Sequence, residues 1–282
     1  ALDAGDDAAA TAAGADTDAA GFGRTDYVGA ANNEANISDL GALELQTEED
    51  SLIVTTEIDV VDAYDQETSL REAVAFANSN ADASIITFDA SLDGQTITLS
   101  GTELTLTSDI TIDGDIDGDN VADITIDGDN QSRVFTISSG GIATLDALTI
   151  SGGNTTASGG GINIAFGGTA TVTNSTLSGN SATEYGGGIN IVSGGIATVT
   201  NSTLSGNSAT QYGGGIYNNG TAEVTNSTLS GNSADYGGGG ISNSGTAEVT
   251  NSTLSGNTAS HGGGIENYQG IVTVTNSTLS GN

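Results

Sequence analysis

The feature of this sequence that most limits its fold is a phrase of eight residues, TNSTLSGN, which occurs five times. Its first asparagines follow one another at intervals of 27, 25, 25 and 25 residues. They are Asn174, Asn201, Asn226, Asn251 and Asn276. A fixed period of this length is typical of a solenoid, in which each repeat forms one coil of the chain.

Apolar residues keep the same step as the phrase. A valine column contains Val172, Val199, Val224, Val249 and Val274; a leucine column contains Leu177, Leu204, Leu229, Leu254 and Leu279; an isoleucine column contains Ile162, Ile189, Ile216, Ile241 and Ile265. A single coil cannot bury its apolar face, whereas stacked coils with strands about 4.8 Å apart can. We therefore predict an all-β solenoid, a right-handed parallel β-helix with three strands in each coil of about 25 residues, beginning near Ile85.

Polar residues also recur in columns, and we interpret them as structural. Turn asparagines (Asn180, Asn207, Asn232, Asn257 and Asn282) predict a hydrogen-bonded ladder. The Asn-x-Ser/Thr sites of the repeats are formal glycosylation sites, but their place inside predicted strands favours a ladder role. His261 precedes a glycine cluster, as Tyr185, Tyr212 and Tyr236 do, so we expect it on the next rung of an aromatic column.

A helix precedes the coils. In residues 67–80, ETSLREAVAFANSN, Ser69 and Glu72 match a capping box, and Leu70, Ala73, Val74 and Ala77 share one apolar face. A solenoid needs a cover over its terminal coil, so we predict that this helix caps it. Arg71 is expected to pair with a nearby carboxylate.

The order TSLREAVAFAN, IITFD, ITIDGDIDGD and the NSTLSGN coils resembles a group of bacterial surface proteins named for a Cys-Ser-Leu-Arg-Glu-Ala motif. The resemblance covers about residues 51–282, and Thr68 stands where that group often has cysteine. It implies a pectate-lyase-like β-helix and an extracellular or cell-surface location. It implies location better than it implies any reaction.

Charge excludes several classes of partner. The formal net charge is −33, with 3 Lys+Arg against 36 Asp+Glu. Such a chain does not neutralise phosphates, so we expect no nucleic-acid partner and no anionic lipid surface. The sequence has no cysteine for disulfides or thiolate metal sites and no apolar run of about 18 residues that would insert into a membrane.

An acidic stretch predicts a metal site. In residues 113–123, DGDIDGDNVAD, the carboxylates of Asp115, Asp117, Asp119 and Asp123 alternate along a tight loop, which suits Ca²⁺. The pattern is similar to calcium loops of integrin-type propellers, with Asn120 at the usual glycine. A second register starting at Asp113 resembles an EF-hand loop but has Ile124 where an acid is needed. A weaker candidate cluster contains Asp59, Asp62 and Asp65.

We divide the chain into residues 1–50, a closing or linker segment that caps a neighbouring β-helix; 51–84, a strand plus the capping helix; and 85–282, the β-helix with its calcium loop near 113–123. The segment 37–46, ISDLGALELQ, looks like a terminal closing strand, while the coil pattern runs on to Asn282. One hypothesis is a head-to-tail homopolymer in which residues 1–50 of one molecule cover the last coil of the next. The other is that the sequence is one repeat of a large tandem protein.

These features favour an extracellular structural protein that assembles with Ca²⁺ into a surface or matrix filament, as in a biofilm. The alternative is an adhesin that binds glycans or ice, for which Thr176, Thr203, Thr228, Thr253 and Thr278 form a rank. A polysaccharide lyase or hydrolase is disfavoured because residues 134–282 contain no Lys or Arg and no clear pair of catalytic carboxylates. We therefore expect no enzyme activity.

Overall fold

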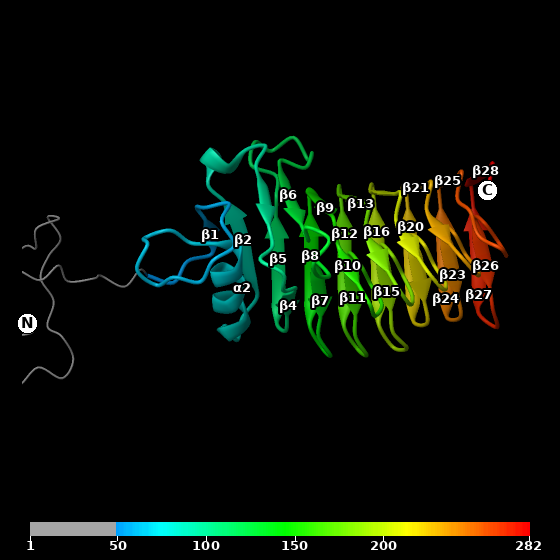
Figure 1. The fold of residues 1–282 in the computed structure, drawn as a ribbon, viewed down its shortest axis with the longest axis horizontal. Coiled ribbons are helices and arrows are strands. Elements are labelled where there is room, and N and C mark those ends of the chain that lie inside the picture. The colour runs from blue at the N-terminus through cyan, green and yellow to red at the C-terminus, as the bar shows by residue number, and fades with distance from the viewer. Residues whose placement is uncertain (1–48) are drawn as a thin grey trace, which may run out of the picture. The chain divides into compact units, whose positions relative to one another are not determined.

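The structure is a computed structural model, and it describes residues 49–282. The chain divides into two units by its contacts, and the second of them consists of residues 50–61 with 67–282. The second unit is a parallel β-solenoid whose rungs follow one another along its axis (Figure 1). The segment predicted to close a neighbouring solenoid, residues 1–50, lies outside the described residues except for Glu49 and Asp50.

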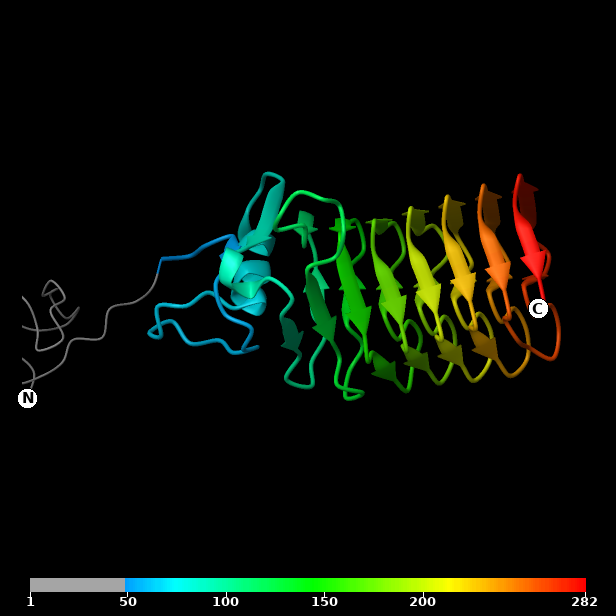
Figure 2. The same ribbon diagram turned by 90° about the horizontal axis from the view of Figure 1, so that it is seen from above.

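Every pairing between the strands of this unit is parallel, which confirms the predicted solenoid. Val172 pairs with Val199, and Val199 with Val224, so successive rungs are 27 and then 25 residues long. The rungs are displaced from one another along the axis in a second view as well (Figure 2). The right hand of the coil remains a prediction from the general handedness of parallel crossovers.

Two long sheets form two sides of the solenoid. The first, of nine strands, consists of β1 (Ile53–Val54), β2 (Ser84–Phe88), β5 (Asp109–Asp113), β8 (Ile142–Asp146), β12 (Thr169–Thr173), β16 (Ile196–Thr200), β20 (Thr221–Thr225), β24 (Thr246–Thr250) and β27 (Ile271–Thr275). The second, of eight strands, consists of β3 (Thr96–Thr98), β6 (Ile124–Asp127), β9 (Leu148–Ser151), β13 (Thr176–Ser178), β17 (Thr203–Ser205), β21 (Thr228–Ser230), β25 (Thr253–Ser255) and β28 (Thr278–Ser280).

Two further sheets complete the rungs. The third, of seven strands, consists of β4 (Leu104–Leu106), β7 (Phe135–Ile137), β11 (Ile162–Ile164), β15 (Ile189–Ile191), β19 (Ile216–Asn218), β23 (Ile241–Asn243) and β26 (Ile265–Asn267). The fourth consists of the two-residue strands β10 (Asn154–Thr155), β14 (Ser181–Ala182), β18 (Ser208–Ala209) and β22 (Ser233–Ala234). This short strand is an addition to the predicted three. Its only buried residue is a small alanine in β14, β18 and β22, and β10 has none, so it gives no apolar pattern to read.

The predicted columns form the core. Val224, Leu229 and Ile216 are at most 1% exposed, and the same holds for their counterparts on the rungs above and below, up to Val249, Leu254 and Ile241. Burying one such side chain contributes roughly 1.5–3 kcal/mol relative to leaving it in water. Because each rung supplies only a few of these side chains, its stability depends on both neighbours.

The predicted asparagine ladder is confirmed. Asn207 is fully buried, and its Nδ2 donates to Oδ1 of Asn232 at 3.0 Å and to the carbonyl of Leu177 at 3.0 Å. Its backbone N–H donates to the same Oδ1 of Asn232 at 3.0 Å. The pattern repeats on Asn180, Asn232 and Asn257. The ladder thus satisfies backbone groups at a corner where no strand pairing does so.

The first asparagine of each phrase occupies a different place. Asn201, Asn226 and Asn251 are exposed corner residues with φ of 51–52°, between two strands rather than inside one. The expectation that these sites lie inside strands is therefore wrong. Weak contacts still join them, with 3.4 Å between Nδ2 of Asn226 and Oδ1 of Asn201. Asparagine suits this corner because it tolerates left-handed backbone better than most residues.

The helix α2 (Leu70–Ser79) lies at the β1–β2 end of the solenoid (Figure 1). Ser69 and Glu72 form the predicted capping box, and Leu70, Ala73, Val74 and Ala77 are buried. A short 3-10 helix, η1 (Ala90–Leu92), follows β2. The side chains of α2 thus close the core at this end, because they bury the apolar face that the first rung leaves uncovered.

The two asparagine columns give a matched test of the ladder. We expect Asn232→Ala to lower the free energy of unfolding by about 2–4 kcal/mol, because it leaves buried donors of Asn207 without an acceptor. The control is Asn226→Gly, which keeps the left-handed corner and is expected to change it by less than about 0.5 kcal/mol. Chemical denaturation followed by circular dichroism measures both; equal effects would contradict the ladder's structural role.

Candidate functional site

The acidic loop lies between β5 and β6 and is closed by its own carboxylates. Asp115 accepts backbone N–H bonds from Gly118 at 2.8 Å, Asp119 at 3.0 Å and Asn120 at 3.0 Å. Asp123 accepts one from Ile116 at 2.8 Å. These bonds turn the chain tightly, and Asn120 takes the left-handed conformation (φ 62°) that was expected of a residue at the usual glycine position.

The turn brings three of the four predicted ligands together. One carboxylate oxygen each of Asp115, Asp117 and Asp123 lies within 4.8 Å of the others. Asp119 does not belong to this group, and its Oδ1 instead accepts the N–H of Val121 at 2.8 Å. Three hard oxygens around one point are a donor set that suits Ca²⁺, with water and backbone carbonyls as further ligands.

Charge repulsion within the loop affects Asp117. A hydrogen bond from the backbone N–H of Asp119 lowers the pKa of Asp117, but desolvation and the neighbouring carboxylates of Asp119, Asp123 and Asp115 raise it, and the net pKa is above the ordinary value. Because repulsion favours the neutral form, the charged loop is destabilised at neutral pH. A bound cation would remove that cost.

In the weaker candidate cluster of Asp59, Asp62 and Asp65, the Asp59 carboxylate is already bound by other side chains. Arg71 binds the Asp59 carboxylate in a bidentate pair, with Nε to Oδ1 at 2.8 Å and Nη2 to Oδ2 at 2.7 Å. The N–H and hydroxyl of Ser100 donate to the same Oδ2 at 2.7 and 2.8 Å. Burial raises the pKa of Asp59, yet the bonds from Arg71 and Ser100 outweigh it and hold the pKa below the ordinary value. This carboxylate is a structural anchor between the segment after β1 and the helix.

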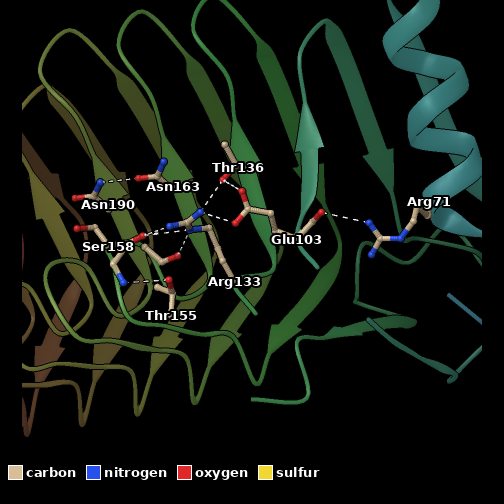
Figure 3. A network of polar contacts seen from close by, with 10 residues as sticks. Arg71, Glu103, Arg133, Thr136, Thr155, Ser158, Asn163 and Asn190 are labelled. Carbon is tan, nitrogen blue, oxygen red and sulfur yellow. Dashed lines mark hydrogen bonds and ion pairs between the residues drawn. The ribbon is translucent and has the colours of Figure 1, made fainter. Parts of the chain in front are cut away.

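The second described arginine is also engaged (Figure 3). Arg133 donates to the carbonyls of Ser158 and Gly159 at 2.7 and 2.8 Å, to the hydroxyl of Thr136 at 3.0 Å, and to the Glu103 carboxylate. Arg71 completes its own set with the carbonyls of Thr102 at 2.8 Å and Glu103 at 3.3 Å. Within residues 49–282, both arginines thus donate their hydrogen bonds to groups of the fold itself, and neither is available to hold an acidic sugar.

Threonines form a longer rank than the sequence indicated. The registers of the eight-stranded sheet align an outward threonine from every strand in a single column. They are Thr96, Thr125, Thr149, Thr176, Thr203, Thr228, Thr253 and Thr278. The three upstream members were missed because the strands before residue 169 lack the repeated phrase. Threonine also favours strands through its branched side chain, so the rank alone does not assign a ligand.

The stacking of the predicted tyrosine column is confirmed, but one of its members lies out of register. The ring of Tyr212 stacks on those of Tyr185 and Tyr236, with centroids 6.2 and 5.7 Å apart. His261 lies on the next rung with its backbone in register with Tyr185 and Tyr212, and it is Tyr236 that is out of register, because Gly237 takes the place between Tyr212 and His261. The rung of Tyr236 has one more glycine after the tyrosine than its neighbours, and this shifts the register by one residue.

Comparison with known protein families adds one finding. A model of the Chlamydia polymorphic membrane protein repeat matches residues 201–219. These residues are similar to a repeat of a surface-protein family. The matched segment covers part of one rung, from the corner before β17 to the residue after β19. Among curated proteins, no match is found. In residues 49–282, no helix has both the length and the apolar character needed to cross a membrane.

Replacing the buried carboxylate tests the role of the Arg71 pair. We expect Asp59→Asn to lower the free energy of unfolding at pH 7 by about 2–3 kcal/mol, which is less than for a fully buried pair because Arg71 keeps 20% of its side chain exposed. The wild-type gain is present above the ordinary Asp pKa of about 3.9 and is lost as pH falls through the lower folded pKa.

Denaturation at several values between about pH 2 and about pH 7, which bracket the ordinary Asp pKa of about 3.9, measures this dependence. The control, Asp82→Asn, changes an exposed carboxylate in the turn after α2 and should leave the pH profile unchanged. A profile for Asp59→Asn that parallels the wild type would contradict the assigned role of the pair.

Proposed function

We propose that this chain is an extracellular or cell-surface structural protein whose solenoids join head to tail into a filament, with Ca²⁺ held by the acidic loop. The similarity of residues 201–219 to a surface-protein repeat supports the location. The net charge of −33 supports divalent cations as natural partners. The observation that carries the structural role is the in-register stack of rungs, whose last described rung offers core columns that further rungs of a longer chain or a second molecule would cover.

On that rung the apolar columns continue without cover. Val274 and Leu279 are 41% and 47% exposed, whereas Val249 and Leu254, one rung earlier in the same columns, are fully buried. The outer edges of β26, β27 and β28 also leave strand donors and acceptors available for pairing. A surface of this kind gains free energy when another rung or segment covers it.

Two different segments would supply that cover. Further rungs of a longer chain would bury the same side chains, which corresponds to a tandem protein. In the proposed filament, residues 1–50 of the next molecule provide it, since the opposite end of the solenoid is already covered by α2. Such a contact between unlike surfaces does not close on itself and therefore propagates.

The calcium component of the proposal rests on Asp115, Asp117 and Asp123. Their carboxylates converge, they lie between two core strands, and the raised pKa of Asp117 reports mutual repulsion that a cation would relieve. A loop fixed in this way would stiffen the connection from β5 to β6 near the capped end. Asp119 contributes to the turn rather than to the group of three.

A structural role fits the chemistry better than catalysis does. Proton abstraction from an acidic sugar needs a basic group and cations that hold the substrate, and both described arginines are bound into the fold. Hydrolysis needs two carboxylates flanking one bond. The carboxylates of Glu223 and Glu248 do lie one rung apart, but both are exposed on the outer side of β20 and β24.

The filament is tested at both contact surfaces. We expect electron microscopy of the chain 1–282 to show filaments. Deletion of residues 1–45, or the double change Val274→Asp with Leu279→Asp, should abolish them because each removes one side of the contact. The control is Phe166→Asp, which charges a side chain that is 68% exposed on a turn away from the last rung. Filaments that persist in the two disrupted forms would overturn the head-to-tail contact.

If the loop binds calcium, the difference in stability between the wild type and Asp117→Asn should change sign when calcium is added. Without calcium, Asp117→Asn should raise the melting temperature, because it removes repulsion from the loop. With calcium at about 100 times its dissociation constant, the wild type should gain about 2.7 kcal/mol and the variant much less. Thermal melts with chelator and with calcium measure both arms.

Asp119→Asn is the matched control, since that carboxylate lies outside the group of three and the variant should keep most of the calcium response. A wild type whose melting temperature is unaffected by calcium would count against the site, whatever the filaments do.

A further inference from the structure

A hollow of about 520 Å³ opens on the outer side of the seven-stranded sheet, over its last strands. Its floor follows one outward column, in which Tyr217 of β19 pairs with Ser242 of β23 and Ser242 pairs with Glu266 of β26. Its walls are Tyr185, Tyr212, Tyr236 and His261 on the turn before the sheet, and Ser244 and Tyr268 on the turn after it.

The extra glycine of one rung explains why the hollow exists. In register, the positions before the sheet are Tyr185, Tyr212, Gly237 and His261, so the third rung has no side chain where its neighbours have a ring. The Glu266 carboxylate occupies that place, since a Cβ on Gly237 would lie 2.0 Å from Glu266 Oε2. Tyr236 is displaced outward and is 55% exposed.

The rings of the hollow are held in place by their neighbours. Tyr217 stacks on Tyr185 with centroids 4.6 Å apart and planes at 25°. Burial is the largest influence on the Tyr217 hydroxyl and raises its pKa, while a hydrogen bond with Ser244 opposes this. Tyr236 stacks on Tyr212, and Tyr268 is 63% exposed. The hollow therefore offers two solvent-facing rings on a rigid aromatic support.

Polar groups lie beside these rings. Glu266 accepts a hydrogen bond from Ser242 at 3.2 Å, and a carboxylate has room for further donors. His261 Nδ1 lies 3.3 Å from the carbonyl oxygen of Tyr236. Because a carbonyl oxygen only accepts, we assign the proton of the neutral ring to Nδ1, and Nε2 is then an acceptor. An aromatic face next to several hydroxyl partners matches a sugar ring, which has one apolar face and a rim of hydroxyls.

Charge narrows the class of sugar. Residues 134–282 contain no Lys or Arg, so neither residue type lies in this part of the chain to pair with a uronate or a sulfate, and Glu266 would repel such an anion. An organic ammonium would need rings arranged around one point, whereas Tyr185, Tyr212 and Tyr236 stack in a column. The open hollow along the rungs also suits a section of a chain rather than an enclosed small molecule.

We propose that the hollow formed by Tyr217, Tyr236, Tyr268 and Glu266 binds a neutral oligosaccharide, with sugar faces on the exposed rings and hydroxyls on the carboxylate and imidazole. The hollow opens on the side of the solenoid, but Glu266 of β26 and Tyr268 belong to the rung whose free edge forms the proposed filament contact, so binding is tested with and without that contact. A surface protein with such a site would attach to neutral glycan chains.

Isothermal titration of the chain 1–282 tests the site. The probes are neutral hexasaccharides of glucose, N-acetylglucosamine and xylose in their β-1,4 and β-1,3 linkages. Hexagalacturonate is the anionic counterpart, and tetramethylammonium is the cationic one. We expect at least one neutral probe to bind and hexagalacturonate not to bind. Tyrosine fluorescence, which tryptophan does not mask in this chain, should change on binding.

Variants locate the binding. Tyr236→Ala combined with Tyr268→Ala should weaken binding by about tenfold or more, the loss expected when stacking partners are removed. Glu266→Gln should also weaken it, while Phe166→Ala, which removes an exposed ring elsewhere, should not. Circular dichroism melts confirm that each variant is folded.

Three results would overturn the proposal: no binding of any neutral probe, equal binding by the folded double variant, or preference for hexagalacturonate or for tetramethylammonium. Repeating the titration with the filament-disrupting change at Val274 and Leu279 separates this outcome from failure of the proposed assembly.

Discussion

The structure depends on side chains that repeat in register and bury one another from rung to rung. No rung could shelter its valine, leucine and isoleucine alone, so the fold exists only as a stack. This explains why the phrase is copied almost without change. A larger or smaller residue in one column would affect the rungs on both sides, because each side chain packs against its own counterparts.

The same requirement applies to the polar backbone at the corners. Where the chain turns, strand pairing stops, and the asparagine and serine ladders take over. Ser202, for example, is 3% exposed, donates to the carbonyl of Thr200 at 2.8 Å and accepts the N–H of Ser175 at 3.1 Å. The residues of TNSTLSGN thus fall into four structural classes: corner, ladder, strand and core. None of these positions needs a ligand to account for it.

This division explains what the sequence predicts and what it does not. The columns, the buried ladder and the capping helix follow from period and capping chemistry, and three of the four loop aspartates do converge. The short fourth strand of each rung was not predicted, because two residues are too few to show a periodic pattern. The register of Tyr236 was misjudged because one added glycine after it moves the tyrosine one residue out of the column. The hollow depends on that shift, so no motif in the sequence announces it.

A solenoid of near-identical rungs gains new surface chemistry through small irregularities. Its core tolerates few changes, but a residue added at a turn leaves the columns in register and alters only what faces water. Here the added glycine at 237 opens space for Glu266 and turns Tyr236 outward. Upstream, the insertion between β5 and β6 holds the acidic loop in the same manner. The repeats therefore provide a regular scaffold, and the two proposed binding sites, the acidic loop and the aromatic hollow, both lie at departures from the repeat.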